Sequence, residues 1–363
     1  MEQLSGPPGC WFPMWRTSQP GFIRAYAWQT ISRGADLVVH FRWRSAVAGA
    51  EQFWHGLIDH SNVPGRRFHE FAQLCQEVNQ LGSQLQGTKL VNEVAILHSF
   101  EQAQALHIQP QALGMEYYEN IKHYHRAITK LGIGCDVINW QESLDGYKVV
   151  IAPSLYVLNP EIVSKLEKFV ADGGRLILTY RTGVKEMNNQ CVMAPLPGLL
   201  SPLAGIVVEE YDPIGNDGHH IIDQSGHEYD CEQWVDIIEL TTAKAIAWYN
   251  DDFYAGKPAV TVNTWGHGKV YYVGTHIEEH AWMERLKQLA EKLQIRMYGE
   301  LPEGVQISVR TGDSGSYLFL LNLSRLQHHI ELPDHYPSVL NPNNEHQGNM
   351  YTLAPYGVEI LKM

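Results

Sequence analysis

The chain has 363 residues, of which 44% are hydrophobic and 18% are charged. This is the balance of an ordinary globular protein with about two or three domains. Its formal net charge is −13, so the chain repels polyanions and nucleic acid is not expected as a partner. No apolar run reaches the roughly 18–20 residues that cross a bilayer, and no charged and then apolar leader opens the sequence. We therefore expect no membrane partner and no secretion signal.

The cysteines are scattered, odd in number and never arranged as Cys-x-x-Cys. This pattern favours neither a disulfide framework nor a zinc finger, and it is typical of a protein in the reducing cytoplasm. The five residues are Cys10, Cys75, Cys135, Cys191 and Cys231.

Residues 1–87 alternate between helical and strand patterns. A helical stretch over 22–34 lies between Pro20-Gly21 and Gly34, which is the expected placement of proline and glycine. A short apolar run at 37–41 predicts a strand, and the three- and four-residue apolar spacing of 66–85 predicts a second helix. This helix–strand–helix order is the repeating unit of a β/α barrel or a doubly wound sheet.

From residue 88 to residue 298 the sequence predicts one flavodoxin-like α/β domain. Near-continuous apolar strands alternate with amphipathic helices, which indicates a parallel sheet covered on both faces. A loop is expected between 98 and 114, and a hairpin between 259 and 274. The predicted strands are 94–97, 136–138, 149–153 and 175–179, and the predicted helices are 117–131 and 160–172.

In residues 299–363 the pattern changes to short strands without intervening helices, which predicts a small antiparallel β-domain. The period-two alternation at 305–310 and the apolar run at 317–322 are separated by a Gly/Asp/Ser turn, and short strands at 330–332 and 358–361 follow. The overall fold class is therefore α/β followed by a small β-module.

Several short motifs follow one another near the N-terminus: Met1-Glu2-Gln3, Trp11, Arg33-Gly34-Ala35-Asp36, His40-Phe41-Arg42-Trp43-Arg44, His55-Gly56 and Asp59-His60. Their order and spacing resemble β-galactosidases of glycoside hydrolase family 42. In that family a Met-Glu segment ends the seventh strand of a (β/α)8 barrel, and a segment like Phe41–Arg44 forms the eighth. The resemblance extends through a flavodoxin-like trimerisation domain, whose fold is like that of class I glutamine amidotransferases, to the C-terminal β-domain.

The resemblance implies a role for four residues. Glu2 stands at the position of the catalytic nucleophile, Trp11 lines the galactose pocket and His55 hydrogen-bonds galactose hydroxyls. Glu51 stands near the family's companion glutamate, which lies three residues before the histidine; here Glu51 is four residues before His55, and Gln52 is three before it. No cofactor and no metal are implied.

The resemblance also implies the reaction, which is hydrolysis of terminal β-D-galactosyl residues with retention. A retaining glycosidase needs a nucleophile and a second carboxylate as acid/base. In the family that glutamate lies on the fourth barrel strand, well before the seventh. We therefore expect an incomplete barrel and a truncated, inactive chain. The expected partners are a galactoside and two further copies, as a homotrimer in the cytoplasm.

Two other functions remain open at this stage. The chain is alternatively a stand-alone oligomerisation or carbohydrate-binding module without catalysis. An amidotransferase-like hydrolase is disfavoured because no cysteine lies in a Gly-x-Cys-x-Gly turn. Cofactor binding by the flavodoxin-like domain is disfavoured because no GxGxxG phosphate loop follows the strand at 94–97. Histidine pairs at 123/125, 219/220 and 328/329 lack true metal-ligand spacing. Apolar helix positions Phe68, Phe71 and Val78 predict self-association if barrel strands are missing.

Overall fold

The computed structural model describes residues 2–7, 9, 12–342 and 348–363, with only the backbone of Glu2. The chain divides into two compact units. The terminal unit contains residues 1–91, 129–134 and 297–363, and the central unit contains residues 92–128 and 135–296. Within the described residues, no helix is both long enough and apolar enough to cross a membrane.

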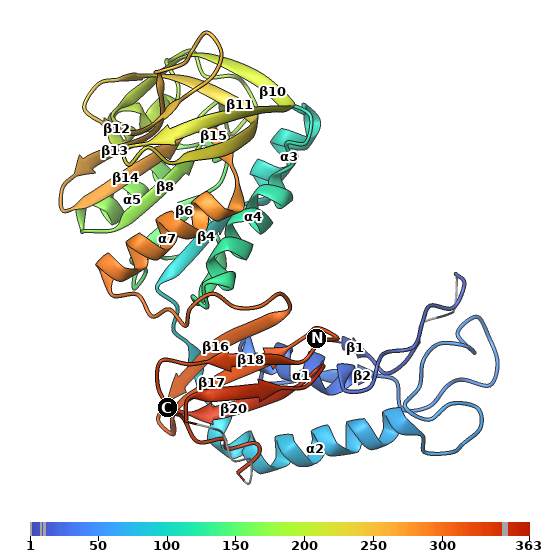
Figure 1. Cartoon of the computed structure of the whole chain (residues 1–363). Helices are drawn as coiled ribbons and strands as arrows, with labels where there is room; N and C mark the ends of the chain where they lie inside the picture. Colours follow the sequence, from blue (N-terminus) through green and yellow to red (C-terminus); the bar gives the residue numbers. More distant parts are fainter. Residues whose placement is uncertain (1, 8, 10–11, 343–347) are drawn as a thin grey trace. The chain divides into compact units, whose positions relative to one another are not determined.

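The terminal unit begins with a short parallel strand pair and two helices (Figure 1). Strand β1 pairs in parallel with β2, with Glu2 opposite Val39 and Leu4 opposite Phe41. The predicted helix over 66–85 is confirmed with the same bounds. The elements are β1 Glu2–Leu4, α1 Phe22–Ser32, β2 Val39–Phe41 and α2 Arg66–Leu85.

A four-stranded antiparallel sheet, in the order β20-β17-β16-β3, completes this unit together with a β18–β19 hairpin. Side chains alternate along β17, so Tyr317 and Phe319 pack with α1 and α2 while Leu318 and Leu320 pack with the hairpin. Both faces of the sheet are therefore covered. The strands are β3 Lys89–Leu90, β16 Val305–Gly312, β17 Gly315–Asn322, β18 His328–Glu331, β19 Met350–Leu353 and β20 Val358–Lys362.

Arg310 ties the end of α1 to this sheet. Its guanidinium donates to the carbonyl oxygens of Ile31 at 2.7 Å and Thr88 at 2.9 Å, and it pairs with Asp36 at 3.1 Å. Because the Arg310 side chain is 2% exposed, losing these partners would leave a buried charge unpaired. Asp36 of the Arg33–Asp36 motif thus has a structural partner far along the chain.

The central unit is built on a ten-stranded mixed sheet in the order β15-β11-β10-β12-β13-β14-β8-β6-β4-β5 (Figure 1). The neighbours from β14 to β5 are parallel, and the neighbours from β15 to β14 are antiparallel. The strands are β4 Val94–His98, β5 Cys135–Asn139, β6 Val149–Ala152, β8 Arg175–Thr179, β10 Ile206–Asp223, β11 Glu228–Leu240, β12 Lys244–Tyr249, β13 Pro258–Trp265, β14 Gly268–Val273 and β15 Thr275–Ile277, with a separate pair β7 Val157–Leu158 and β9 Lys185–Glu186.

Helices lie against both faces of the parallel strands. Leu166 and Val170 of α5 pack with Leu176 and Leu178 of β8 in one core, and α7 lies against the opposite face of the sheet (Figure 1). The helices are α3 Phe100–Ile108, α4 Tyr117–Lys130, α5 Pro160–Ala171, η1 Gly198–Leu200, α6 Ser201–Ala204 and α7 Glu279–Leu293.

Two sequence-based expectations for this unit are corrected. The segment between 98 and 114 is not one loop, because α3 occupies Phe100–Ile108 and the Ser99 hydroxyl accepts from the Gln102 amide at its start. The sheet is not parallel throughout, because the long β10–β11 hairpin adds antiparallel strands. Pro213 and the glycines within β10 are residues typical of turns, so the sequence of this strand does not predict a strand.

Candidate active site

The predicted site lies in the terminal unit, around the β1–β2 pair. Glu2 is the first residue of β1, and its side chain lies outside the described atoms, as does the whole of Trp11. The two strands continue beyond their formal ends, because the Ser5 amide donates to the Phe41 carbonyl at 3.1 Å. The backbone that follows Glu2 is therefore fixed against the strand that precedes Arg42.

His55 is held directly beside this backbone. The Ser5 N–H also points at Nδ1 of His55, at 3.2 Å, so Nδ1 accepts and the ring proton of the neutral imidazole belongs on Nε2. His55 is 2% exposed, and its Nε2 has no hydrogen-bond partner among the described residues. Burial, with smaller contributions from Arg42 and Arg67, lowers the pKa of His55 to about 4. The ring is therefore a neutral donor with one unfilled hydrogen bond.

A close approach at Gly6 makes this arrangement possible. A Cβ at Gly6 would lie 2.9 Å from Nε of Arg67 and 3.1 Å from Cβ of His55. Arg67 in turn donates to the Gly56 carbonyl at 3.0 Å, which holds the chain on the other side of His55. A side chain at position 6 would therefore require Arg67 and His55 to shift.

Glu51 is placed by an arginine that sequence reasoning did not assign. Arg42 Nη1 lies 3.2 Å from Oε2 of Glu51, and Nη2 donates to the Glu51 carbonyl at 2.5 Å. The Glu51 carboxylate remains 41% exposed. The backbone of Arg42 is bound to the same loop, because its amide donates to the His55 carbonyl at 3.3 Å. Glu51 and His55 thus both connect to the residue that follows β2.

An aromatic wall beside His55 was also missed. The ring centroids of Trp54 and His55 are 4.8 Å apart, and Trp54 contacts Phe41 at 6.4 Å and Phe12 at 6.3 Å. Phe12 contacts Trp15 at 5.4 Å, and Trp15 is 67% exposed. Indole faces suit the C–H face of a sugar. The signal in the sequence was Phe53-Trp54 directly before His55.

The carboxyl ends of the parallel strands in the central unit are filled by side chains. Ligands of open α/β sheets bind at such a crevice, but here the Gln102 amide bridges both backbone groups of Val157 at 2.7 and 2.8 Å. The buried Tyr180 hydroxyl contacts Asn120, Gln233 and His276 at 3.1 to 3.3 Å. These polar groups satisfy one another within the unit.

The described cysteines Cys75, Cys135, Cys191 and Cys231 are free thiols, and Cys10 lies outside the described residues. Burial raises the pKa of Cys231 to about 12 and raises the pKa of Cys75, so both stay protonated and unreactive at neutral pH. In residues 2–7, 9, 12–342 and 348–363, no three His, Cys, Asp or Glu side chains gather as a metal-ligand set.

Three family models match the chain in the order expected. The model described as "Beta-galactosidase" matches residues 1–81, "Beta-galactosidase trimerisation domain" matches residues 92–296, and "Beta-galactosidase C-terminal domain" matches residues 304–363.

Curated relatives and solved structures agree with these matches. Beta-galactosidase BgaA of Clostridium cellulovorans is 50% identical over 363 residues, which are 100% of this chain and 55% of the relative. Beta-galactosidase BgaB of a Geobacillus strain is 35% identical over 317 residues, covering 87% of this chain and 47% of the relative. The crystal structure of a β-galactosidase from Bacillus circulans sp. alkalophilus superposes with a TM-score of 0.93 at 28% identity, covering 100% of this chain and 55% of that one.

The chain spans about half the length of the curated relatives it matches. The family models, the relatives and the fold point to the same assignment. The chain belongs to the β-galactosidases of glycoside hydrolase family 42.

Proposed function

We propose that this chain carries the nucleophile and part of the galactose-binding surface of a retaining β-galactosidase. The observation that supports this most is the arrangement of His55 next to β1. A neutral imidazole, whose Nε2 is buried and has no hydrogen-bond partner among the described residues, is held against the strand that begins with Glu2. Such a buried donor distinguishes a correctly placed sugar hydroxyl from an apolar group, because leaving it unpaired is costly.

Each predicted site residue has a role in this proposal. Glu2 attacks the anomeric carbon, and a covalent galactosyl intermediate forms and is then hydrolysed. His55 donates to a galactose hydroxyl, while Glu51, oriented by Arg42, accepts from one. Trp11 supplies an apolar platform for the sugar, and Trp54 extends that platform at the ring of His55.

The second carboxylate is proposed to come from outside the β1–β2 pair. A β/α barrel needs eight strands to close, and in the described residues β1 and β2 form a sheet of two strands. The relatives are about twice as long as the matched segment, so their additional residues are the source of the acid/base in this proposal. The chain alone is then expected to be inactive.

We further propose a homotrimer assembled through residues 92–296, because the family model for that segment is described as a trimerisation domain. The order β5-β4-β6-β8-β14 of the parallel strands supports a flavodoxin-like module. The proposed domains are 1–87 (barrel portion), 88–298 (trimerisation) and 299–363 (β-domain). A role in galactose metabolism within the cytoplasm fits the galactoside substrate and the free cysteines.

The experiment compares the purified chain with a chimera in which the part of BgaA that precedes the matched segment is joined to this chain. Both are assayed with nitrophenyl β-D-galactoside, each beside its Glu2→Gln variant and a control, Glu303→Gln, at an exposed glutamate. We expect no hydrolysis by the chain alone, hydrolysis by the chimera, and a loss on the order of 10⁴-fold in its Glu2→Gln variant.

A folded chimera without hydrolysis, or one whose Glu2→Gln variant keeps full activity, would overturn the proposed catalytic role. Activity of the chain alone that disappears with Glu2→Gln would contradict the external acid/base. Galactose binding without hydrolysis by either protein would favour the carbohydrate-binding module.

A further inference from the structure

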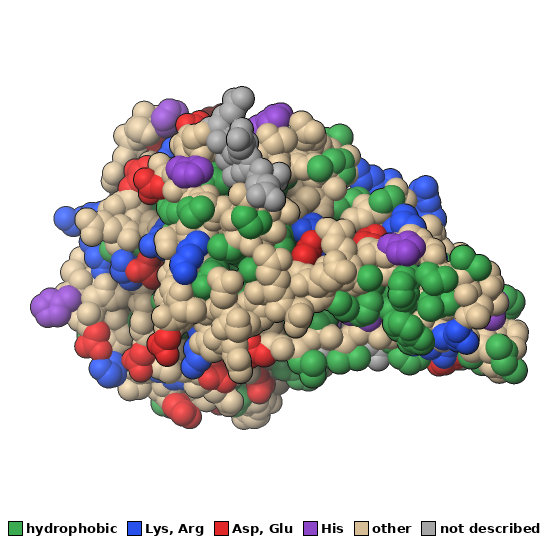
Figure 2. Space-filling view, turned by 90° about the horizontal axis from the view of Figure 1, so that it is seen from below, with side chains coloured by type: hydrophobic (Ala, Val, Ile, Leu, Met, Phe, Trp, Pro, Cys, Tyr) green, Lys and Arg blue, Asp and Glu red, His purple; other side chains and the backbone are tan. Residues whose placement is uncertain are grey.

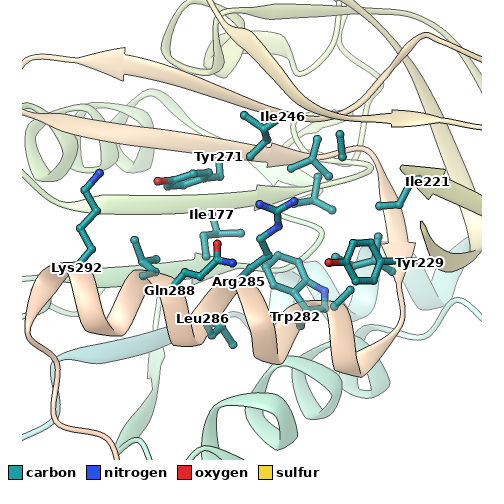
Figure 3. A pocket seen from close by; sticks show the side chains of 16 residues that line it. Ile177, Ile221, Tyr229, Ile246, Tyr271, Trp282, Arg285, Leu286, Gln288 and Lys292 are labelled. Atoms are coloured by element: carbon teal, nitrogen blue, oxygen red, sulfur yellow. The ribbon is translucent and has the colours of Figure 1, made fainter. Parts of the chain in front are cut away.

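A cavity of about 240 Å³ lies within the central unit, between helix α7 and the sheet (Figure 3). Trp282, Leu286 and Leu289 of α7 form one wall. Side chains from β8 and from β10 to β15, among them Ile177 and Tyr271, form the other. None of these residues takes part in the proposed galactoside site, so the cavity is a separate feature.

The cavity exists because one helix covers several strands. A helix is about 10–12 Å wide, whereas the adjacent strands β10, β12, β13, β14 and β8 are spaced about 4.8 Å apart. In Figure 3, α7 runs alongside these strands. Along β14, Val270 and Tyr272 face the core formed with α5, while Tyr271 and Val273 face the cavity. The α5 side is filled and the α7 side is not.

The lining is mostly apolar. Ile177, Ile221 and Val273 are at most 3% exposed, whereas Ile246 and Val260 are half-buried. An apolar cavity of roughly 150 Å³ stays dry and takes up a benzene-sized molecule. This cavity is larger and is partly open, so a hydrocarbon group can enter it.

The charged residues of the lining are all basic. Arg285 and Lys292 contribute to it and no Asp or Glu does, although the whole chain carries a net charge of −13. Arg285 pairs with Asp223 at 3.0 Å. Lys292, which is exposed, has no ion pair or hydrogen bond with any described residue. One cation at the mouth therefore lacks a counter-charge.

A hydrogen-bond donor lies at the same end. The Tyr271 hydroxyl has no hydrogen-bond partner in the part of the chain that the structure describes, and in Figure 3 it points toward the end where Lys292 extends from α7. Burial raises the pKa of Tyr271, and the charges acting on it come from Arg175 and Arg285. The hydroxyl thus keeps its proton and faces a positive environment suited to an anion.

We propose that this cavity binds a monocarboxylate with an apolar tail, with the tail against Ile177 and Val260 and the carboxylate at Tyr271 and Lys292. The phenol donates a hydrogen bond to the carboxylate and the ammonium pairs with it, and such charge-assisted bonds are the stronger kind. A free sugar does not fit, because its hydroxyls would lose their hydrogen bonds to water among apolar side chains.

Calorimetric titration of the full chain with octanoate tests this, beside octylamine, which has the same tail and the opposite charge. Lys292→Gln and Tyr271→Phe remove the carboxylate partners, and Val260→Phe fills the cavity. Lys287→Gln is the matched control, because Lys287 is exposed on the same helix and does not line the cavity. Thermal unfolding establishes that each variant is folded.

We expect saturable binding of one octanoate per chain and none of octylamine. Affinity falls by at least about fivefold in Lys292→Gln and in Tyr271→Phe, is lost in Val260→Phe and is unchanged in Lys287→Gln. Absence of octanoate binding at millimolar concentration, equal binding of octylamine, or an unchanged affinity in Lys292→Gln would overturn the proposal. If Val260→Phe does not fold, Lys292→Gln at the exposed mouth still decides the question.

Discussion

The Ser5 amide donates to Nδ1 of His55 across 3.2 Å, linking the end of β1 to a histidine fifty residues later. The same amide proton is shared with the Phe41 carbonyl at 3.1 Å. Because a backbone N–H cannot change its role, this contact selects the tautomer with its proton on Nε2. The ring nitrogen that carries the proton of His55 is thus set by the backbone that follows β1, the strand that begins at Glu2.

His55→Ala in the active chimera removes this donor. We expect kcat/KM for nitrophenyl β-D-galactoside to fall roughly 10–100-fold, because a hydrogen bond to the substrate contributes about 1–3 kcal/mol. The pKa of His55 is lowered to about 4 by burial, so the ring is neutral above that value. The difference between His55→Ala and the parent should therefore be the same at pH 5.5 and pH 7.5; a difference that changes with a midpoint near pH 6.5 would contradict the buried, neutral ring.

Glu51 and Gln52 are the two candidates for the side chain that is proposed to accept a hydrogen bond from a galactose hydroxyl. The Arg42–Glu51 pair is half-exposed, so its contribution to stability is at most about 1 kcal/mol. We expect Glu51→Gln to leave the free energy of unfolding within that range while lowering kcat/KM about tenfold. Gln52→Ala serves as the neighbour control and should leave both quantities unchanged. The reverse result, a loss only in Gln52→Ala, would move the role to Gln52.

Stability of the central unit should decrease in acid through a buried histidine pair. The rings of His123 and His276 are 4.4 Å apart, and burial lowers their pKa values to about 4 and about 3 from 6.5. The unfolded chain therefore takes up protons first as the pH falls. Their contribution is complete above pH 6.5 and is lost progressively between pH 6.5 and about pH 3–4. Urea unfolding at pH 7.5 and pH 5 measures this.

The double variant His123→Gln/His276→Gln should show a smaller loss of unfolding free energy between those two pH values. His280→Gln is the control, because its side chain is 70% exposed. If the double variant has the same pH dependence as the parent, the buried pair is not its source.

Exposed apolar side chains of the terminal unit predict self-association. Figure 2 shows hydrophobic side chains gathered toward one end of this view. Trp15, Trp43 and Phe53 are 67%, 57% and 54% exposed, which is unusual for side chains of this size. We expect light scattering to detect species larger than a trimer, and the triple serine variant at these positions to reduce them to a trimer. A monodisperse monomer of the parent chain would contradict both the trimer and the association.

The sequence predicts a helix or strand well where its buried face leaves a regular apolar pattern in the sequence. Helix α2 has regular apolar spacing and strand β8 has a continuous apolar run, and both were predicted with their observed bounds. Helix α3 was missed because its sequence, FEQAQALHI, has no clear apolar stripe. The β10–β11 hairpin was missed because its pairing contains several register shifts, which interrupt the regular alternation of a strand.

The expectation for the exposed helix faces needs a partial correction. Phe71 packs against a core formed by α1, α2 and the C-terminal sheet, so the C-terminal strands cover a surface that was expected to need missing barrel strands. Val78 remains 36% exposed. Sequence patterns show that a face is apolar, but they do not show which distant segment covers it.

For the site, the family resemblance suggested which residues to consider but not which neighbouring groups hold them in place. Glu51 and His55 were named from the resemblance, whereas the contacts of Arg42, Trp54 and the Ser5 amide with them are visible only in the fold. Gly6 was not assigned a role from the sequence, and only the fold shows how closely its backbone approaches His55 and Arg67. The roles of Glu2, Trp11, Glu51 and His55 all remain predictions.

The most direct test of the account is to trap the covalent intermediate. An activated 2-deoxy-2-fluorogalactoside slows hydrolysis of a galactosyl-enzyme, because the 2-hydroxyl contacts that strengthen in the transition state are lost. We predict that the chimera gains one fluorogalactosyl mass, that peptide mapping places it on the peptide containing Glu2, and that Glu2→Gln abolishes it. A label on a different carboxylate, with Glu2 unmodified, would contradict the assignment of the nucleophile.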